Sequence, residues 1–141
     1  MEAANRGAFR AGGKSIGMNI SMPVEQYPNP YISEELSFLF HYFFMRKFWL
    51  IYKAKAVVAF PGGYGTLDEV FETLTLIQTG KIDRNHIIIL LYGEKYWREI
   101  INFESFLKYK TINQEDIHLF SYASTPKEAF SFLKKNFVKF L

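Results

Sequence analysis

Hydrophobic and polar positions along the chain follow two patterns, one typical of helices and one typical of strands. The most regular helical pattern starts after Thr66 and ends at Gly80, with apolar side chains every three or four residues. These apolar positions are Leu67, Val70, Phe71, Leu74 and Ile77. Thr66 is a residue type that caps helices, and Asp68 and Glu69 follow where carboxylates complement the helix dipole. The pattern therefore predicts a helix capped by Thr66.

Short apolar runs predict the strands. Residues 56–60 form one such run, and residues 86–92 contain five consecutive apolar residues, which suits a strand covered on both faces. Residues 14–21 alternate between apolar and polar side chains, as in a strand with one buried face. Residues 37–43 and 119–122 are also expected to be strands.

Helical segments are expected between these strands, namely residues 1–11, 46–55, 96–109 and 126–140. Gly12 and Gly13 follow the first of these and suit a helix end. Thr125 opens the last one, with Pro126 at its first position. Residues 24–30 are rich in proline, which predicts an extended loop.

The alternation of strand and helix predicts an α/β fold of the Rossmann-like, doubly wound type with a parallel sheet. The chain has 141 residues, of which 49% are hydrophobic and 18% aromatic, enough for a sizeable core. We therefore expect a single domain over residues 1–141.

Composition argues against several classes of protein. The chain carries 17 Lys and Arg against 14 Asp and Glu, and apart from a small C-terminal cluster its basic residues are scattered, so no nucleic acid is expected as a partner. It has no cysteine, and its three histidines are far apart, so no metal site is expected. Charges interrupt the most apolar region and no secretory signal opens the sequence, so no membrane span is expected. These features predict a cytoplasmic protein.

The residues 61–69, Pro-Gly-Gly-Tyr-Gly-Thr-Leu-Asp-Glu, carry the clearest chemistry in the sequence. They join an expected strand to an expected helix, and three glycines in four positions allow the backbone to approach an anion closely. The spacing differs from both the Gly-x-Gly-x-x-Gly and the Gly-x-x-x-x-Gly-Lys-Ser/Thr fingerprints. The loop alone is compatible with phosphate binding or with a mere tight turn.

Together with Arg46-Lys47 upstream, this motif resembles that of the LOG ("lonely guy") phosphoribohydrolases, proteins often labelled lysine decarboxylases. Other stretches agree with the bacterial branch of that family, and the resemblance covers nearly the whole chain. The agreeing stretches are residues 1–8 (Met-Glu-Ala-Ala-Asn-Arg-Gly-Ala), 12–17 (Gly-Gly-Lys-Ser-Ile-Gly), Glu25-Gln26, 29–31 (Asn-Pro-Tyr), 42–44 (Tyr-Phe-Phe) and 74–80 (Leu-Thr-Leu-Ile-Gln-Thr-Gly).

The resemblance implies hydrolysis of the N-glycosidic bond of a nucleoside 5′-monophosphate, AMP or a cytokinin riboside monophosphate, without metal or other cofactor. It implies that Arg46 and Glu69 are the catalytic pair. The substrate-binding residues that it implies are Glu25, Lys47, Gly63, Tyr64, Gly65, Thr66 and Thr75. It also implies a homodimer.

Each of these residues also has a purely structural interpretation. Glu69 has the position of a carboxylate that complements a helix dipole. Arg46 has an alternative as a surface residue whose stem lies along an aromatic face, and Glu25 as a solvated loop carboxylate. The aromatic cluster over residues 38–49 favours a core or dimer interface rather than a platform for base stacking.

Members of the family begin with two strands and a helix that this sequence lacks ahead of Met1. In the doubly wound order these strands would lie between the strands expected at residues 14–21 and 56–60. We therefore expect a chain truncated at its N-terminus, with a sheet lacking its first two strands. An inactive nucleotide-binding or interaction remnant is the alternative function. A pyridoxal-phosphate decarboxylase is disfavoured, because no lysine lies in the setting of a Schiff base.

Overall fold

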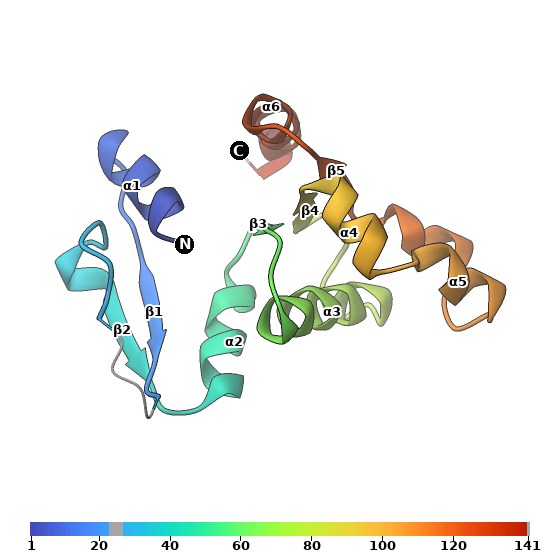
Figure 1. The fold of residues 1–141 in the computed structure, drawn as a ribbon, viewed down its shortest axis with the longest axis horizontal. Coiled ribbons are helices and arrows are strands. Elements are labelled where there is room, and N and C mark those ends of the chain that lie inside the picture. Colours follow the sequence, from blue (N-terminus) through green and yellow to red (C-terminus); the bar gives the residue numbers. More distant parts are fainter. Residues whose placement is uncertain (23–26, 141) are drawn as a thin grey trace. The chain divides into compact units, whose positions relative to one another are not determined.

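The computed structural model describes residues 1–22 and 27–140 and contains two compact units, Met1–Lys53 and Ala54–Leu141. In each unit the strands pair in parallel, with helices between them (Figure 1). The α/β, Rossmann-like class expected from the sequence is thereby confirmed. The described strands form two sheets rather than one, with orders β1-β2 and β3-β4-β5.

The N-terminal unit contains helix α1 (Glu2–Arg10), strand β1 (Gly17–Ile20), the 3-10 turn η1 (Glu34–Leu36), strand β2 (Ser37–Phe40) and helix α2 (Phe43–Tyr52). Helix α1 ends near Gly12, whose φ of +70° suits a glycine after a helix. Strand β2 ends at Phe40 and helix α2 begins at Phe43, each three residues earlier than expected. The aromatic run, whose pattern fits both strand and helix, therefore changes from strand to helix between these two residues. Arg46 therefore lies inside α2 rather than at its start.

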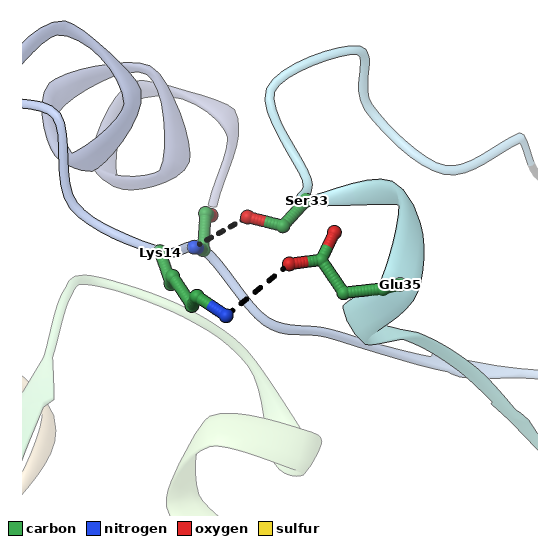
Figure 2. Close-up of polar contacts among 4 residues, drawn as sticks. Lys14, Ser33 and Glu35 are labelled. Atoms are coloured by element: carbon green, nitrogen blue, oxygen red, sulfur yellow. Dashed lines mark hydrogen bonds and ion pairs between the residues drawn. The ribbon is translucent and has the colours of Figure 1, made fainter.

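Polar contacts join the loops of the N-terminal unit. The side-chain amide of Asn5 donates to Ser15 Oγ (2.5 Å), and that of Asn29 donates to Asn5 Oδ1 (2.9 Å). The backbone N–H of Ser15 donates to Ser33 Oγ (3.1 Å), as Figure 2 shows. These bonds link α1, the start of β1 and the segment before η1.

An ion pair accompanies the Ser33 hydroxyl in the N-terminal unit. Lys14 Nζ lies 3.5 Å from Glu35 Oε1 (Figure 2). The pKa of the Glu35 carboxyl lies below its usual value, mainly because the backbone N–H of Glu35 donates to it. The hydrogen bond and positive charge of Lys14 lower this pKa further. Both side chains are exposed, so this pair adds little to stability.

The C-terminal unit contains the remaining elements. They are β3 (Ala56–Ala59), α3 (Tyr64–Gln78), β4 (Ile88–Tyr92), α4 (Glu94–Ile100), α5 (Phe103–Lys108), the 3-10 helix η2 (Gln114–Leu119), β5 (Ser121–Ala123), α6 (Pro126–Phe137) and the 3-10 turn η3 (Val138–Phe140). Helices α6 and α3 lie on opposite sides of the sheet β3-β4-β5 (Figure 1). No helix of the described residues is long and apolar enough to cross a membrane.

Both faces of β4 are buried. Leu90 packs with Ala123 and Ala129 under α6, while Ile89 and Leu91 are just as inaccessible and fall on the opposite face of the strand. The continuous apolar run at residues 86–92 predicted this arrangement, and the prediction is confirmed.

Two helix boundaries in the C-terminal unit differ from the expectation. The helix expected over residues 96–109 is split into α4 and α5, because Ile101 is extended and Asn102 caps a new helix by accepting from Ser105 N–H (3.0 Å). Thr66 is not the cap of α3: Gly63 occupies that position and α3 starts at Tyr64. Asp68 and Glu69 consequently lie beyond the first turn.

A reciprocal capping box holds the start of α6. Glu128 N–H donates to Thr125 Oγ1 (3.2 Å), and Glu128 Oε2 accepts from the N–H groups of Ser124 (2.8 Å) and Thr125 (3.3 Å). These bonds, that from Ser124 N–H first, lower the pKa of Glu128. The box confirms Thr125 as the residue that opens this helix.

Thr125→Ala is expected to lower the free energy of unfolding by about 1 kcal/mol near neutral pH, because it removes the cap acceptor. The measurement is urea unfolding, with Thr125→Ser as the control that keeps the hydroxyl. Since the folded pKa of Glu128 is lowered, its share of the stabilisation is present above the unfolded pKa of about 4.3 and is lost as the pH falls through the folded pKa. Equal stability of the Ala and Ser variants would contradict the capping role.

Candidate functional site

The glycine loop lies between the end of β3 and the first turn of α3. Gly63 is the N-cap of α3 with φ −86° and ψ −150°, and Leu67 N–H donates to Gly63 C=O (3.1 Å). The N–H groups of Tyr64, Gly65 and Thr66 precede this bond, at the positions where helical N–H groups have no partner within the helix. The positive end of the helix dipole adds to them. Such a helix start favours an anion.

The glycines of this loop leave space rather than relieve strain. The positive-φ glycines of the described residues are Gly12, Gly80 and Gly93, and none is in the loop. A Cβ on Gly63 or Gly65 would meet nothing within 4 Å. Neither glycine is therefore required by a tight turn or by packing within the chain. The absent side chains instead let another molecule approach the backbone closely.

The start of the glycine loop, Pro61 and Gly62, is held by contacts with other residues of the C-terminal unit. Tyr96 Oη donates to Gly62 C=O (2.6 Å), and a Cβ on Gly62 would overlap Thr66 Oγ1. A Cβ on Gly93 would lie 3.2 Å from Pro61 Cγ, so the start of α4 stands directly behind the loop. No pattern in the sequence marks Tyr96, because its partner is a backbone carbonyl 34 residues away.

Glu69 lies on the second turn of α3 and is half-buried. Its backbone carbonyl accepts from Thr73 Oγ1 (2.7 Å), and buried Val70 follows it. The dipole effect falls off within the first turn, so its position no longer supports the interpretation of Glu69 as a dipole partner. Asp68 beside it is exposed.

Thr75 lies further along α3, on another face. Thr75 lies six positions after Glu69, which places the two side chains about 120° apart around the helix and about 9 Å apart along it. Thr75 lines a cavity of about 290 Å³ between α3, α5 and η2, and its hydroxyl donates to Phe71 C=O (2.7 Å). The cavity is lined mainly by Phe71, Leu74, Phe103, Phe106, Leu119 and Phe120, with Gln78 and Asp116 among its polar groups. The structure therefore does not bring Thr75 onto the face of Glu69.

The remaining candidates belong to the N-terminal unit. Arg46 and Lys47 are neighbours on α2 and are half-buried, and the guanidinium of Arg46 lies 5.7 Å from the ring centroid of Phe43. The aromatic contact agrees with the interpretation of Arg46 as a residue on an aromatic face. Glu25 lies outside the described residues.

In the described part of the chain, no three His, Cys, Asp or Glu residues lie close enough together to hold a metal ion. Within the C-terminal unit the described residues form an open helix start with glycines and a carboxylate on the following turn. The basic pair on α2 belongs to the N-terminal unit. An anion-binding loop next to a carboxylate suits a reaction on a phosphorylated substrate that develops positive charge.

Comparisons with known proteins address the family of this chain rather than its individual site residues. Residues 1–133 match the family model described as "Possible lysine decarboxylase". The chain is 32% identical over 84 residues to the probable cytokinin riboside 5′-monophosphate phosphoribohydrolase LOGL6 of Oryza sativa subsp. japonica. That match covers 59% of this chain and 33% of LOGL6, so it spans about a third of the relative's length. With a family match over most of its residues, the chain belongs to the family of possible lysine decarboxylases, the LOG family.

Proposed function

We propose that this chain hydrolyses the N-glycosidic bond of nucleoside 5′-monophosphates, with AMP or a cytokinin riboside monophosphate as substrate. In this reaction the bond between ribose C1′ and the base nitrogen breaks, a water oxygen bonds to C1′, and the base leaves with a proton. The products are the free base and ribose 5-phosphate. The name of the rice relative supports this substrate class.

The observation that carries the proposal is the open glycine loop at the start of α3. Gly63 and Gly65 have no conformational or packing requirement within the chain, and exposed Tyr64 lies between them. We assign the 5′-phosphate to the N–H groups of Gly63, Tyr64, Gly65 and Thr66. Because Thr66 is the third helical residue, its N–H and hydroxyl both belong to the first turn.

Glu69 and Arg46 are proposed as the catalytic pair. Departure of the base leaves positive charge on the ribose ring, which the Glu69 carboxylate would stabilise while it orients the attacking water. The Arg46 guanidinium would bind phosphate oxygens or polarise the leaving base, with Lys47 beside it. Glu25 and Thr75 complete the proposed substrate contacts. Thr75 points away from the face of Glu69, so it would serve the substrate from another side.

The purified chain is expected to release adenine from AMP, or the modified base from isopentenyladenosine monophosphate, without added metal. Chromatography of the free base is the measurement, with adenosine as the matched substrate that lacks the phosphate. Adenosine should be cleaved much more slowly, because it cannot use the glycine loop. Binding of AMP without release of base would contradict the proposal and favour a nucleotide-binding remnant.

A homodimer is part of the proposal. Helix α2 exposes large aromatic side chains, among them Phe44, Phe48, Trp49 and Tyr52, and the last three contact one another. Exposed apolar groups of this size are more typical of an interface than of a free surface.

A further inference from the structure

We propose that Tyr96 is a positioning residue for the phosphate loop: its hydroxyl fixes the peptide between Gly62 and Gly63 so that the Gly63 N–H faces the ligand. This inference rests on the proposed function, because it takes the loop as the site of the 5′-phosphate. It assigns a role to a side chain on α4, an element that carries none of the expected site residues.

The peptide plane between Gly62 and Gly63 has its carbonyl held by Tyr96. Tyr96 Oη donates to Gly62 C=O at 2.6 Å, a short hydrogen bond between groups 34 residues apart. In a trans peptide the C=O and the N–H that follows it point in opposite directions. When Tyr96 holds the carbonyl of Gly62, the N–H of Gly63 points away from Tyr96. That N–H stands at the N-cap of α3, where an anion is favoured.

Two consecutive glycines make this anchor necessary. A peptide between Gly62 and Gly63 has no Cβ on either side to restrict its rotation. Without a hydrogen-bond partner for the Gly62 carbonyl, the peptide plane can rotate and the Gly63 N–H no longer points in one direction. Donor groups that are already oriented bind an anion better than groups that must be ordered on binding.

Tyr96 is itself well placed to act as a rigid anchor. Its ring is half-buried and meets the ring of fully buried Trp97 edge to face at 5.4 Å. Trp97 Nε1 donates to Tyr92 C=O (3.0 Å), which fixes this turn of α4 to the end of β4. Gly93, at the start of α4, lies against Pro61, the residue before the two glycines. The loop is therefore supported by α4 through two separate contacts.

The test compares Tyr96→Phe with Tyr109→Phe in the full 141-residue chain. Each variant loses one hydroxyl and keeps its ring, and Tyr109 is exposed at the end of α5. Ribose 5-phosphate is titrated into each protein by calorimetry. Tyr96→Phe should bind it about fivefold to tenfold more weakly, the effect of about one net hydrogen bond, and Tyr109→Phe should bind it as the wild type does.

Kinetics separate positioning from a general structural effect. For AMP, Tyr96→Phe should raise KM by a similar factor with kcat nearly unchanged, as expected when binding common to ground and transition state is lost. Cleavage of adenosine should be unaffected. A wild-type chain that binds ribose 5-phosphate without releasing base would contradict the proposed activity, whereas weaker binding by Tyr96→Phe would still support the positioning role.

Wild-type affinity for ribose 5-phosphate in Tyr96→Phe would overturn the inference. A second measurement does not depend on how the variant folds. In ¹⁵N NMR spectra of the wild-type chain, ribose 5-phosphate should shift the amide signal of Gly63 far more than that of Gly80 at the other end of α3. An unshifted Gly63 amide would also overturn the inference.

Discussion

Replacing Glu69 by glutamine is expected to slow base release from AMP by about 100-fold to 10,000-fold, the range typical for loss of a group that transfers protons. Glutamine has nearly the same size, but it is neutral and cannot accept a proton from the attacking water. It also removes the negative charge proposed to stabilise the developing positive charge on the ribose. The measurement is the rate of adenine release, followed by chromatography.

Asp68→Asn is the matched control for this substitution. Asp68 is the adjacent carboxylate on the same helix, but it is exposed, whereas Glu69 is half-buried. The control should retain nearly full activity. Glu69→Gln should still bind ribose 5-phosphate through the glycine loop, because its carboxylate is not part of that loop. Unchanged base release in Glu69→Gln, or an equal loss in Asp68→Asn, would exclude Glu69 as the catalytic carboxylate.

Much of the fold was predictable because burial and periodicity act locally along the chain. The apolar run of β4 predicted a strand covered on both faces, and both faces are buried by α6 and by the opposite layer. Thr125 and Pro126 predicted the start of α6, because a cap residue and a proline at the first position act within one turn.

The predictions that failed depended on competition between local signals. Thr66 has the side chain of a cap, yet α3 starts at Tyr64 and Thr66 packs its hydroxyl over Gly62. Glycine is an acceptable cap as well, and composition does not rank the two at one helix start. Asn102 does not stand out as a cap in the sequence because the helical period continues across it, although its side chain starts a new helix.

The candidate site was predictable to different extents. The residues of the glycine loop by themselves suggested either an anion site or a tight turn, because strand, glycines and helix start follow directly in sequence. Arg46, Glu25 and Thr75 came from the family resemblance alone. Tyr96 escaped prediction, since a tyrosine that holds a distant carbonyl leaves no pattern along the chain.

Trp97→Ala is expected to lower the free energy of unfolding of the C-terminal unit by about 3 to 5 kcal/mol. Trp97 is 0% exposed, so the substitution leaves a large cavity beneath α4. It also removes the indole N–H that donates to Tyr92 C=O, which leaves that carbonyl without this bond (3.0 Å in the structure). A loss of this size is a large fraction of the stability of a small domain, so the urea midpoint of the variant should lie well below that of the wild type.

Urea unfolding, followed by circular dichroism, measures this loss of stability. Two further variants serve as comparisons. Trp97→Phe fills part of the cavity and should recover part of the stability, although it cannot restore the hydrogen bond to Tyr92. Phe130→Ala removes an aromatic ring from the same unit, but that ring is 67% exposed on α6 and should cost about 0.5 kcal/mol or less. Equal destabilisation by Trp97→Ala and Phe130→Ala would contradict the placement of Trp97 in the core. Since Trp97 also packs against Tyr96, a destabilised α4 should weaken binding of ribose 5-phosphate, which would link the core of this unit to the glycine loop proposed to bind phosphate.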